Sequence, residues 1–180
     1  RSRDVCNLVI LISLGACFEF YDLFLTAYVA PGLVRAHIVS PAATGLFDGV
    51  AGFVASFFAG LFLGTAVFGF VADRLGRRAI FTFSLVWYAA TASVMAFQHD
   101  AFWLDVWRFA GGIGIGVELV TIDTYIAELA PKEARGRAFA YANVIQFLSI
   151  PLVALLAFLL VPRAPFGFDG WRIVVLAGAA

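Results

Sequence analysis

The chain has 180 residues, of which 63% are hydrophobic and only 13% are charged. Soluble domains carry about 25% charged residues, so this composition excludes a soluble protein and indicates an integral membrane protein. The formal net charge is zero and the basic residues occur in small, scattered groups, which excludes a nucleic-acid-binding face.

Apolar windows of membrane-spanning length recur along the chain. The predicted spans are 5–29, 47–72, 79–97, 102–130 and 138–162, with a sixth that starts at 171 and runs to 180. The first is too long for the core of a signal peptide and is read as a retained span. The connections around 31–41 and 163–170 carry Pro with Gly or His, and we expect loops there. The sequence therefore predicts an all-α membrane fold with five spans and the start of a sixth.

The positions of Lys and Arg predict the orientation. With the amino terminus inside, most of the 12 basic residues fall in inner segments. These are Arg1, Arg3, Arg74, Arg77, Arg78, Lys132, Arg135 and Arg137, against Arg35, Arg108, Arg163 and Arg172 in or near outer regions. Because cytoplasmic loops carry an excess of basic residues, we expect a cytoplasmic amino terminus. The location expected is a plasma membrane or bacterial inner membrane, crossed several times.

Two carboxylates interrupt the first span. Gly15, Glu19, Asp22 and Thr26 follow a spacing of four, three and four, so they line one stripe of a helix. An ionised carboxylate in a bilayer costs several kcal/mol unless it faces water or a partner, which makes Glu19 and Asp22 functional candidates. The alternative is that one of them only ties two helices together.

A charged turn separates the second and third spans. Residues 69–78 read Gly-Phe-Val-Ala-Asp-Arg-Leu-Gly-Arg-Arg. Gly76 permits a reversal of the chain, and Arg77 and Arg78 resist translocation across the membrane. Asp73 offers a negative charge to the start of the next helix. The segment is therefore expected as a short cytoplasmic hinge.

Pairs of glycines at four-residue spacing accompany the spans: Gly45 with Gly49, Gly60 with Gly64, and Gly112 with Gly116. Small residues at this spacing allow the backbones of two membrane helices to approach closely. We therefore expect close packing between spans at these positions.

Arg108 is a potential partner for the carboxylates of the first span. The fourth span runs inward, so Arg108 lies about 10 Å below its outer end, close in depth to Glu19 and Asp22. Protonating an acidic group beside a permanently charged Arg would release the pair, which is the physical basis of a proton-coupled gate. Glu19, Asp22 and Arg108 are therefore candidates for proton coupling. The alternative is a local pair between Arg108 and Asp105.

Further polar residues are candidates for a substrate cavity. Glu118, Thr121 and Tyr125 share a stripe of the fourth span, whereas Asp123 points about 140° away from Glu118. Glu118 could instead join an inner salt-bridge network with Arg77 or Arg78.

Asn143 and Gln146 are three residues apart in the fifth span. They could bind a polar substrate or a neighbouring helix. The two histidines are isolated, no Cys and His cluster has metal-ligand spacing, and no nucleophile–base pair is visible, so we expect no catalytic residue, metal or cofactor, and no enzyme.

Three of these segments, in order, resemble the signature motifs of the major facilitator superfamily of transporters. The hinge resembles its G-x-x-x-D-R-x-G-R-R loop, and Arg108 with the glycines of 111–116 resembles its fourth-span motif. Residues 128–136 resemble the E-x-x-P-x-x-x-R-G of sugar porters and metabolite:proton symporters, and 18–22 resemble the acidic-aromatic patch of proton-coupled members. The resemblance implies the amino-terminal, six-helix half of a twelve-helix fold, 1–180, ending within the sixth span.

The resemblance also implies roles. Spans 1 and 4 would line the central cavity, and span 3 would be peripheral, which makes Tyr88 and Thr91 poor site candidates. A cytoplasmic network would stabilise the outward-open state and break during alternating access. Its members in this sequence would be Gly69, Asp73, Arg74, Gly76, Arg77, Arg78, Glu128 and Arg135.

The expected function is secondary active transport, with proton-coupled symport of a small polar metabolite such as a sugar or an organic acid. Span 5 has Pro151, which could kink it, but lacks the glycine-rich motif of drug:proton antiporters, which favours symport. The expected partners are a small-molecule substrate, protons, the lipid bilayer and the missing carboxy-terminal half. The alternatives are a non-transporting membrane subunit, a receptor-like homologue or an inactive fragment. We predict that the 180 residues do not transport alone.

Overall fold

The fold is a bundle of long helices, seen here in a computed structural model that describes residues 2–41, 49–132, 134–163 and 168–179. No strand occurs within these ranges. The helices are α1 (Ser2–Arg35), α2 (Gly49–Leu75), α3 (Arg77–Ala96), α4 (Ala101–Leu129), α5 (Arg135–Phe147), α6 (Ser149–Leu160) and α7 (Gly170–Ala179). The predicted all-α class is therefore confirmed.

Five stretches of the described helices are long and apolar enough to cross a membrane. They are Ser13–Arg35, Gly49–Val67, Ala79–Ala96, Ala101–Glu128 and Arg135–Leu160, and the short apolar helix Gly170–Ala179 follows. These stretches overlap the five predicted spans and the start of the sixth. The chain is therefore a multi-pass membrane protein.

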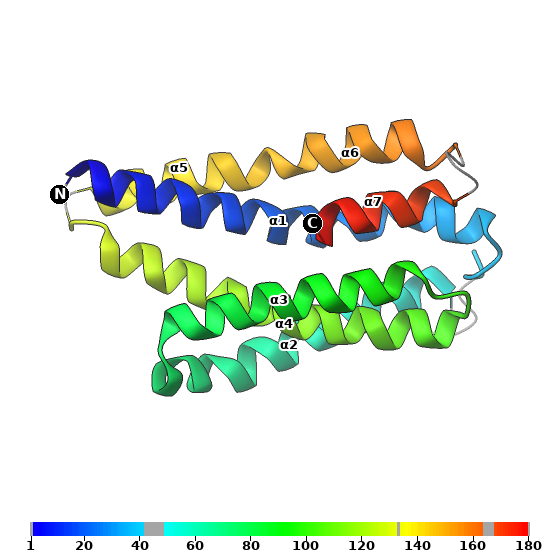
Figure 1. Cartoon of the computed structure of the whole chain (residues 1–180), viewed down its shortest axis with the longest axis horizontal. Helices are drawn as coiled ribbons and strands as arrows, with labels where there is room; N and C mark the ends of the chain where they lie inside the picture. Colours follow the sequence, from blue (N-terminus) through cyan, green and yellow to red (C-terminus); the bar gives the residue numbers. More distant parts are fainter. Residues whose placement is uncertain (1, 42–48, 133, 164–167, 180) are drawn as a thin grey trace.

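Successive connections alternate between the two ends of the bundle (Figure 1). The amino terminus, the α2–α3 turn and the α4–α5 connection lie at one end, and the connections after α1, α3 and α6 lie at the other. The segments predicted to be cytoplasmic thus share one end. The assignment of that end to the cytoplasm stays a prediction from the distribution of basic residues.

The first helix is longer than predicted. We expected a loop from Pro31 onward, but α1 continues through Pro31 to Arg35. Its last turn packs against the start of α7, since a Cβ atom added to Gly32 would lie 2.7 Å from the Cβ of Trp171. Leu33 is buried in the same core. This tertiary packing outweighs the backbone hydrogen bond that a proline removes.

The fifth span contains a break, as Pro151 suggested. Helix α5 ends at Phe147 and α6 begins at Ser149, so the interruption falls at Leu148. Proline cannot donate to the carbonyl four residues earlier, and its ring crowds that carbonyl, which here belongs to Phe147. The local sequence therefore accounts for the break.

Helix α4 packs between α2 and α3, while α1 packs against α5, α6 and α7 and also contacts α4 (Figure 1). The α2–α4 contact depends on glycines, as predicted. A Cβ atom at Gly60 would lie 2.1 Å from the backbone oxygen of Phe109, and one at Gly112 would lie 2.4 Å from that of Phe57. Real Cβ atoms do not approach this closely, so the two backbones could not pack this way with larger residues.

Substituting Gly60 with Ala should therefore destabilise the bundle. The added methyl group would push against backbone, and such overpacking costs about 1–3 kcal/mol. Gly136→Ala is the matched control, because nothing lies within 4 Å of a Cβ atom at that position. Thermal unfolding of the purified protein, followed by loss of the monodisperse species, measures both. Equal unfolding temperatures for the two variants would contradict the prediction.

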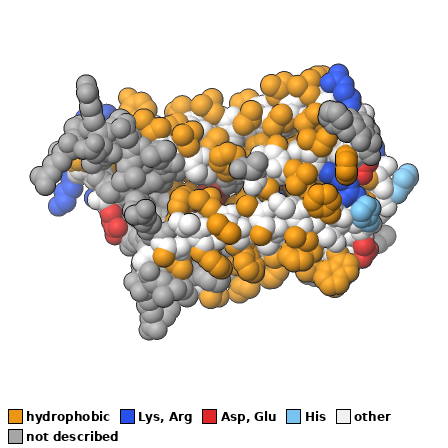
Figure 2. All heavy atoms as spheres, viewed as in Figure 1, with side chains coloured by type: hydrophobic (Ala, Val, Ile, Leu, Met, Phe, Trp, Pro, Cys, Tyr) orange, Lys and Arg blue, Asp and Glu red, His pale blue; other side chains and the backbone are white. Residues whose placement is uncertain are grey.

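The surface of the bundle suits a lipid environment. Figure 2 shows hydrophobic side chains over the middle of one face, with charged and histidine side chains mostly near the ends. Large exposed side chains include Phe62, Val86, Phe102, Leu155 and Phe158. A soluble monomer rarely exposes so much contiguous apolar surface. These residues therefore face lipid or other apolar partners.

The first half of helix α7 is hydrogen-bonded to α1 and to the end of α3. The hydroxyl of Tyr21 donates to the backbone oxygen of Val174 at 2.8 Å. Arg172 donates to the backbone oxygens of Ala96 and Gln98 and so caps the carboxyl end of α3. These contacts hold α7 against α1 and the end of α3.

Candidate functional site

An ion pair between α1 and α4 lies inside the bundle. The Nη1 atom of Arg108 lies 2.7 Å and 2.9 Å from the two carboxylate oxygens of Asp22. Its Nη2 atom donates to the backbone oxygen of Asp22 at 3.0 Å and to the hydroxyl of Thr26. Asp22 and Thr26 are four residues apart, so one face of α1 supplies every acceptor. One guanidinium therefore binds three groups on neighbouring turns of a single helix.

The ion pair is buried, and two aromatic rings pack against its arginine. The exposed fraction is 2% for Arg108 and 0% for Asp22. The guanidinium carbon of Arg108 lies 4.2 Å from the ring centroid of Phe57 and 5.2 Å from that of Phe53, both on α2. Such cation–π contacts stabilise a buried arginine. Arg108 thus joins α1, α2 and α4 at one point.

The structure selects between the partners left open by the sequence. Arg108 pairs with Asp22 rather than with Glu19 or with its own neighbour Asp105. The Oδ1 atom of Asp105 is buried without a hydrogen-bond partner. Depth matching between the spans therefore predicted the correct helix pair, and the local alternative is wrong.

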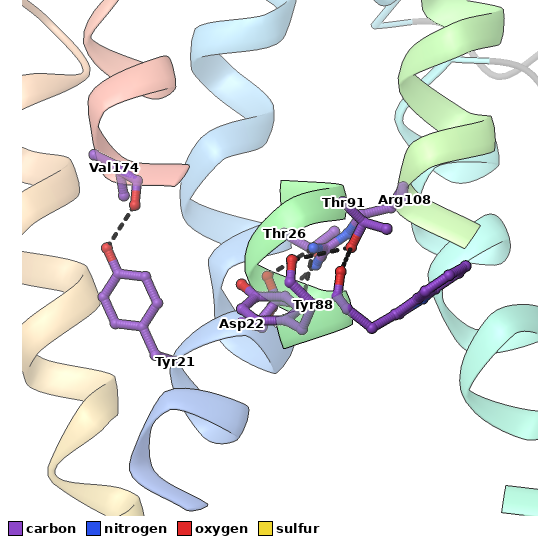
Figure 3. Close-up of polar contacts among 8 residues, drawn as sticks. Tyr21, Asp22, Thr26, Tyr88, Thr91, Arg108 and Val174 are labelled. Atoms are coloured by element: carbon purple, nitrogen blue, oxygen red, sulfur yellow. Dashed lines mark hydrogen bonds and ion pairs between the residues drawn. The ribbon is translucent and has the colours of Figure 1, made fainter. Parts of the chain in front are cut away.

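Two residues of α3 lie closer to this pair than the resemblance implied. Figure 3 shows Tyr88 and Thr91 beside Asp22 and Arg108. Both are buried, and the Thr91 hydroxyl donates within α3, to the backbone oxygen of Trp87 or of Tyr88, each 3.0 Å away. The Tyr88 hydroxyl has no hydrogen-bond partner. The expectation that both residues lie at the periphery is not met within this half of the fold.

Glu118 is buried, with an exposed fraction of 1%. Its Oε1 atom lies 3.2 Å from the hydroxyl oxygen of Ser84 on α3. Thr121 is also buried, but its hydroxyl donates to the backbone oxygen of Val117 at 2.7 Å. The side chains of Tyr125, Arg77 and Arg78 lie outside the described residues, so the predicted stripe and the alternative inner network stay predictions.

The two polar residues of the fifth span differ in environment. Gln146 is buried within α5, whereas Asn143 is exposed. The T-shaped contact of Phe20 with Phe147, with ring centroids 5.2 Å apart, places the end of α5 beside α1. Gln146 thus remains a cavity candidate on a helix that packs against α1.

The predicted gating network lies at the end of the bundle that holds the α2–α3 turn. Gly76 has a φ of 88°, in the left-handed region that favours glycine, and reverses the chain between α2 and α3 as predicted. Glu128 and Arg135 are exposed at the same end. The side chains of Asp73 and Arg74 and the surroundings of Gly69 are outside the part of the chain that the structure describes. The network stays a prediction.

Sequence reasoning missed several contributors to the site. Phe53 and Phe57 enclose Arg108, and Ser84 contacts Glu118. The two phenylalanines are four residues apart and so share a helix face, which is the signal that could have identified them. Ser84 gives no such signal, because serine is common in membrane helices for packing reasons alone.

A bundle that crosses the membrane repeatedly around a buried carboxylate–arginine pair defines a multi-pass membrane protein with a charged site in its interior. The sequence matches the Major Facilitator Superfamily over residues 12–180. The match covers most of the chain, so the chain belongs to the Major Facilitator Superfamily. Members of this family are transporters, and this membership confirms the prediction that the chain is not an enzyme.

Particular relatives are similar along most of the chain. The niacin transporter NiaP of Acinetobacter baylyi is 29% identical over 96% of this chain and 37% of its own length. The arabinose-proton symporter of Bacillus subtilis is 32% identical over 83% of this chain and 32% of its own length. The inward-open xylose transporter XylE from E. coli superposes with a TM-score of 0.81 at 22% identity, over 97% of this chain and 45% of that structure. The chain thus spans about a third of the length of these curated relatives.

Proposed function

We propose that this chain is part of a proton-coupled symporter of a small polar metabolite, such as a sugar or an organic acid. The observation that supports this most is the buried Asp22–Arg108 pair. Similar relatives carry names that state transport of niacin and of arabinose with protons. The remaining part of the cavity would come from a carboxy-terminal half like that of the relatives.

Asp22 is the group proposed to exchange the proton. While its carboxylate is ionised, it accepts both hydrogen bonds from Nη1 of Arg108 and holds α4 against α1. Opposite charges about 4 Å apart attract by about 4 kcal/mol at an effective dielectric constant near 20. Protonation at one Oδ atom of Asp22 removes that attraction. A change of this size alters a conformational equilibrium by about a thousandfold.

Arg108 is the group proposed to bind substrate once it is released. Its Nη2 atom would stay held by the Asp22 backbone and Thr26, while the donors of Nη1 turn to a hydroxyl or carboxylate of the substrate. The same arginine thereby links proton binding to substrate binding. Substrate release would return Nη1 to the deprotonated Asp22.

Proteoliposomes that contain the full-length protein test the proposal. Labelled arabinose and niacin are the probes, because relatives are named for them. An inward proton gradient should drive accumulation of one of them, and a protonophore should abolish it. Accumulation driven by a sodium gradient at equal pH would contradict proton coupling. Absence of uptake with both gradients would favour a non-transporting subunit or receptor-like role.

A further inference from the structure

Two further carboxyl groups, those of Glu19 and Glu118, lie about one helical turn from Asp22, on the side of the α2–α3 turn. Ala16 on α1 belongs to the same buried cluster as Ile122 and Ile126 on α4, which sets the register of the two helices. Glu19 is three residues beyond Ala16, and Glu118 is four residues before Ile122. Since the two helices run in opposite directions, Glu19 and Glu118 lie at a similar level between this cluster and the Asp22–Arg108 pair.

Helix α3 contributes a residue at the same depth as Glu19 and Glu118. A Cβ atom at Gly15 would lie 3.0 Å from the ring tip of Phe81, so α3 contacts α1 directly below. Ser84 follows one turn later and contacts Glu118. Residues from three helices thus meet at one depth: Glu19, Ser84 and Glu118.

Both carboxyl groups are buried, and neither has a basic partner among the described side chains. Glu19 is 3% exposed and Glu118 is 1% exposed. The Oε1 atom of Glu19 has no hydrogen-bond partner. Neither glutamate forms an ion pair with any basic side chain among those the structure describes. A buried charge without a partner costs several kcal/mol, so the site requires a positive charge from elsewhere.

Among the described side chains, the charged groups around the two glutamates do not supply this positive charge. Arg108 is committed to Asp22, and Asp22 and Asp123 add negative charge within electrostatic range of the two glutamates. From α3 the nearby titratable group is the neutral phenol of Tyr88. Helix α5 contributes the neutral Gln146 at its buried face, while Arg135 and Arg137 are exposed.

The hydroxyl of Ser84 lies within hydrogen-bond distance of two oxygens and can donate to either of them. Its oxygen lies 2.9 Å from the backbone oxygen of Phe81 and 3.2 Å from Oε1 of Glu118. A serine hydroxyl has a single hydrogen to donate. When that hydrogen is donated to the nearer oxygen, of Phe81, the second contact is a hydrogen bond only if Glu118 carries a proton and donates it to Ser84.

We propose that Glu19 and Glu118 form a second proton-binding site, separate from Asp22, in which the proton resides on Oε1 of Glu118 and is donated to Ser84. Glu19, whose Oε1 has no partner, is the acceptor to which this proton can pass. The role of this site in transport rests on the proposed symport, but its protonation does not. The ligand of the site is a proton, because the carboxyl groups are too buried for a larger cation to reach without movement of the helices.

Infrared difference spectroscopy of the full-length protein in lipid tests this site without any substrate. Isotope-labelled glutamate separates the carbonyl band of a protonated Glu from that of Asp. At neutral pH the unsubstituted protein should show a protonated glutamate band, and E118Q should lose it. The variant S84A should keep the band but shift its frequency, because the hydrogen bond from Glu118 is removed. D100N is the control, since Asp100 is an exposed carboxylate just before α4, at the end of the bundle opposite the α2–α3 turn, and its spectrum should match the unsubstituted protein.

Three outcomes would overturn the proposal. One is the absence of a protonated glutamate band at neutral pH. Another is a band that E118Q leaves intact and E19Q removes. The third is a band unaffected by S84A. If E118Q does not fold, E19Q and S84A still decide, because the first should retain the Glu118 band and the second should shift it. If the uptake assay fails while the protonated glutamate band is present, the proposed symport is refuted but the proton-binding site is not.

Discussion

Substituting Arg108 with Met should lower the free energy of unfolding by about 3–5 kcal/mol, because it leaves the Asp22 carboxylate buried without a counter-charge. Asp22 is fully buried and accepts both of its side-chain hydrogen bonds from Arg108. Methionine fills most of the same space between Phe53 and Phe57, so the loss measures charge rather than volume. Chemical or thermal unfolding of the purified full-length protein gives the value.

A second substitution distinguishes the loss of the Asp22–Arg108 ion pair from the loss of the other contacts of Arg108. Adding Asp22→Asn to Arg108→Met removes the unpaired carboxylate, and the double variant should recover a large share of the lost stability. Arg137→Met serves as the control for losing a positive charge, since Arg137 is exposed on α5, and it should change stability by less than about 0.5 kcal/mol. A double variant no more stable than Arg108→Met alone would show that Arg108 stabilises the fold through its stacking on Phe57 rather than through Asp22.

The course of the backbone through the membrane was largely predictable from the sequence. Apolar windows located the five crossings, and the glycines at 60 and 112 predicted close packing between spans, which the structure places between α2 and α4. The windows failed at Pro31, because they measure hydropathy and carry no information on the packing of Gly32 against Trp171. Helix ends that depend on tertiary contacts are not encoded in local composition.

The site was predictable only in part. The stripe of Glu19, Asp22 and Thr26 and the depth of Arg108 follow from helix geometry, which is why the α1–α4 pairing could be expected. The choice of Asp22 over Glu19 depends on the rotation of α1 against α4, which a single sequence does not show. The contact between Ser84 and Glu118 likewise required the placement of α3 beside Glu118.

The buried carboxyl group of Asp22 and those of Glu19 and Glu118 are suited to different roles in transport. Asp22 lies next to a fixed positive charge, so its protonation changes a contact between helices. Glu118 lies next to neutral Ser84, so its protonation changes no ion pair among the described side chains. Protonation of Asp22 is therefore suited to altering conformation, whereas the glutamates are suited to storing a proton on its route.

Asp22→Asn should abolish proton-driven accumulation of substrate while leaving exchange of substrate across the membrane. An asparagine keeps the shape of the side chain and can still accept a hydrogen bond from Arg108, but it cannot bind or release a proton. A gradient of one pH unit is worth about 1.4 kcal/mol per proton, or about tenfold accumulation in a coupled carrier. With the full-length protein in proteoliposomes, the unsubstituted carrier should approach that ratio, and the variant should stop at equal concentrations.

Asp105→Asn is the matched control for this variant. Asp105 precedes Arg108 by one turn on α4 but forms no pair with it, so its substitution should leave accumulation near tenfold. Exchange separates lost coupling from lost folding, because a variant that equilibrates labelled substrate must still alternate between its two open states. Tenfold accumulation by Asp22→Asn would show that the proton binds elsewhere in the cavity. Among the described residues, Glu19 and Glu118 would then be the remaining buried carboxylates of α1 and α4 able to couple it.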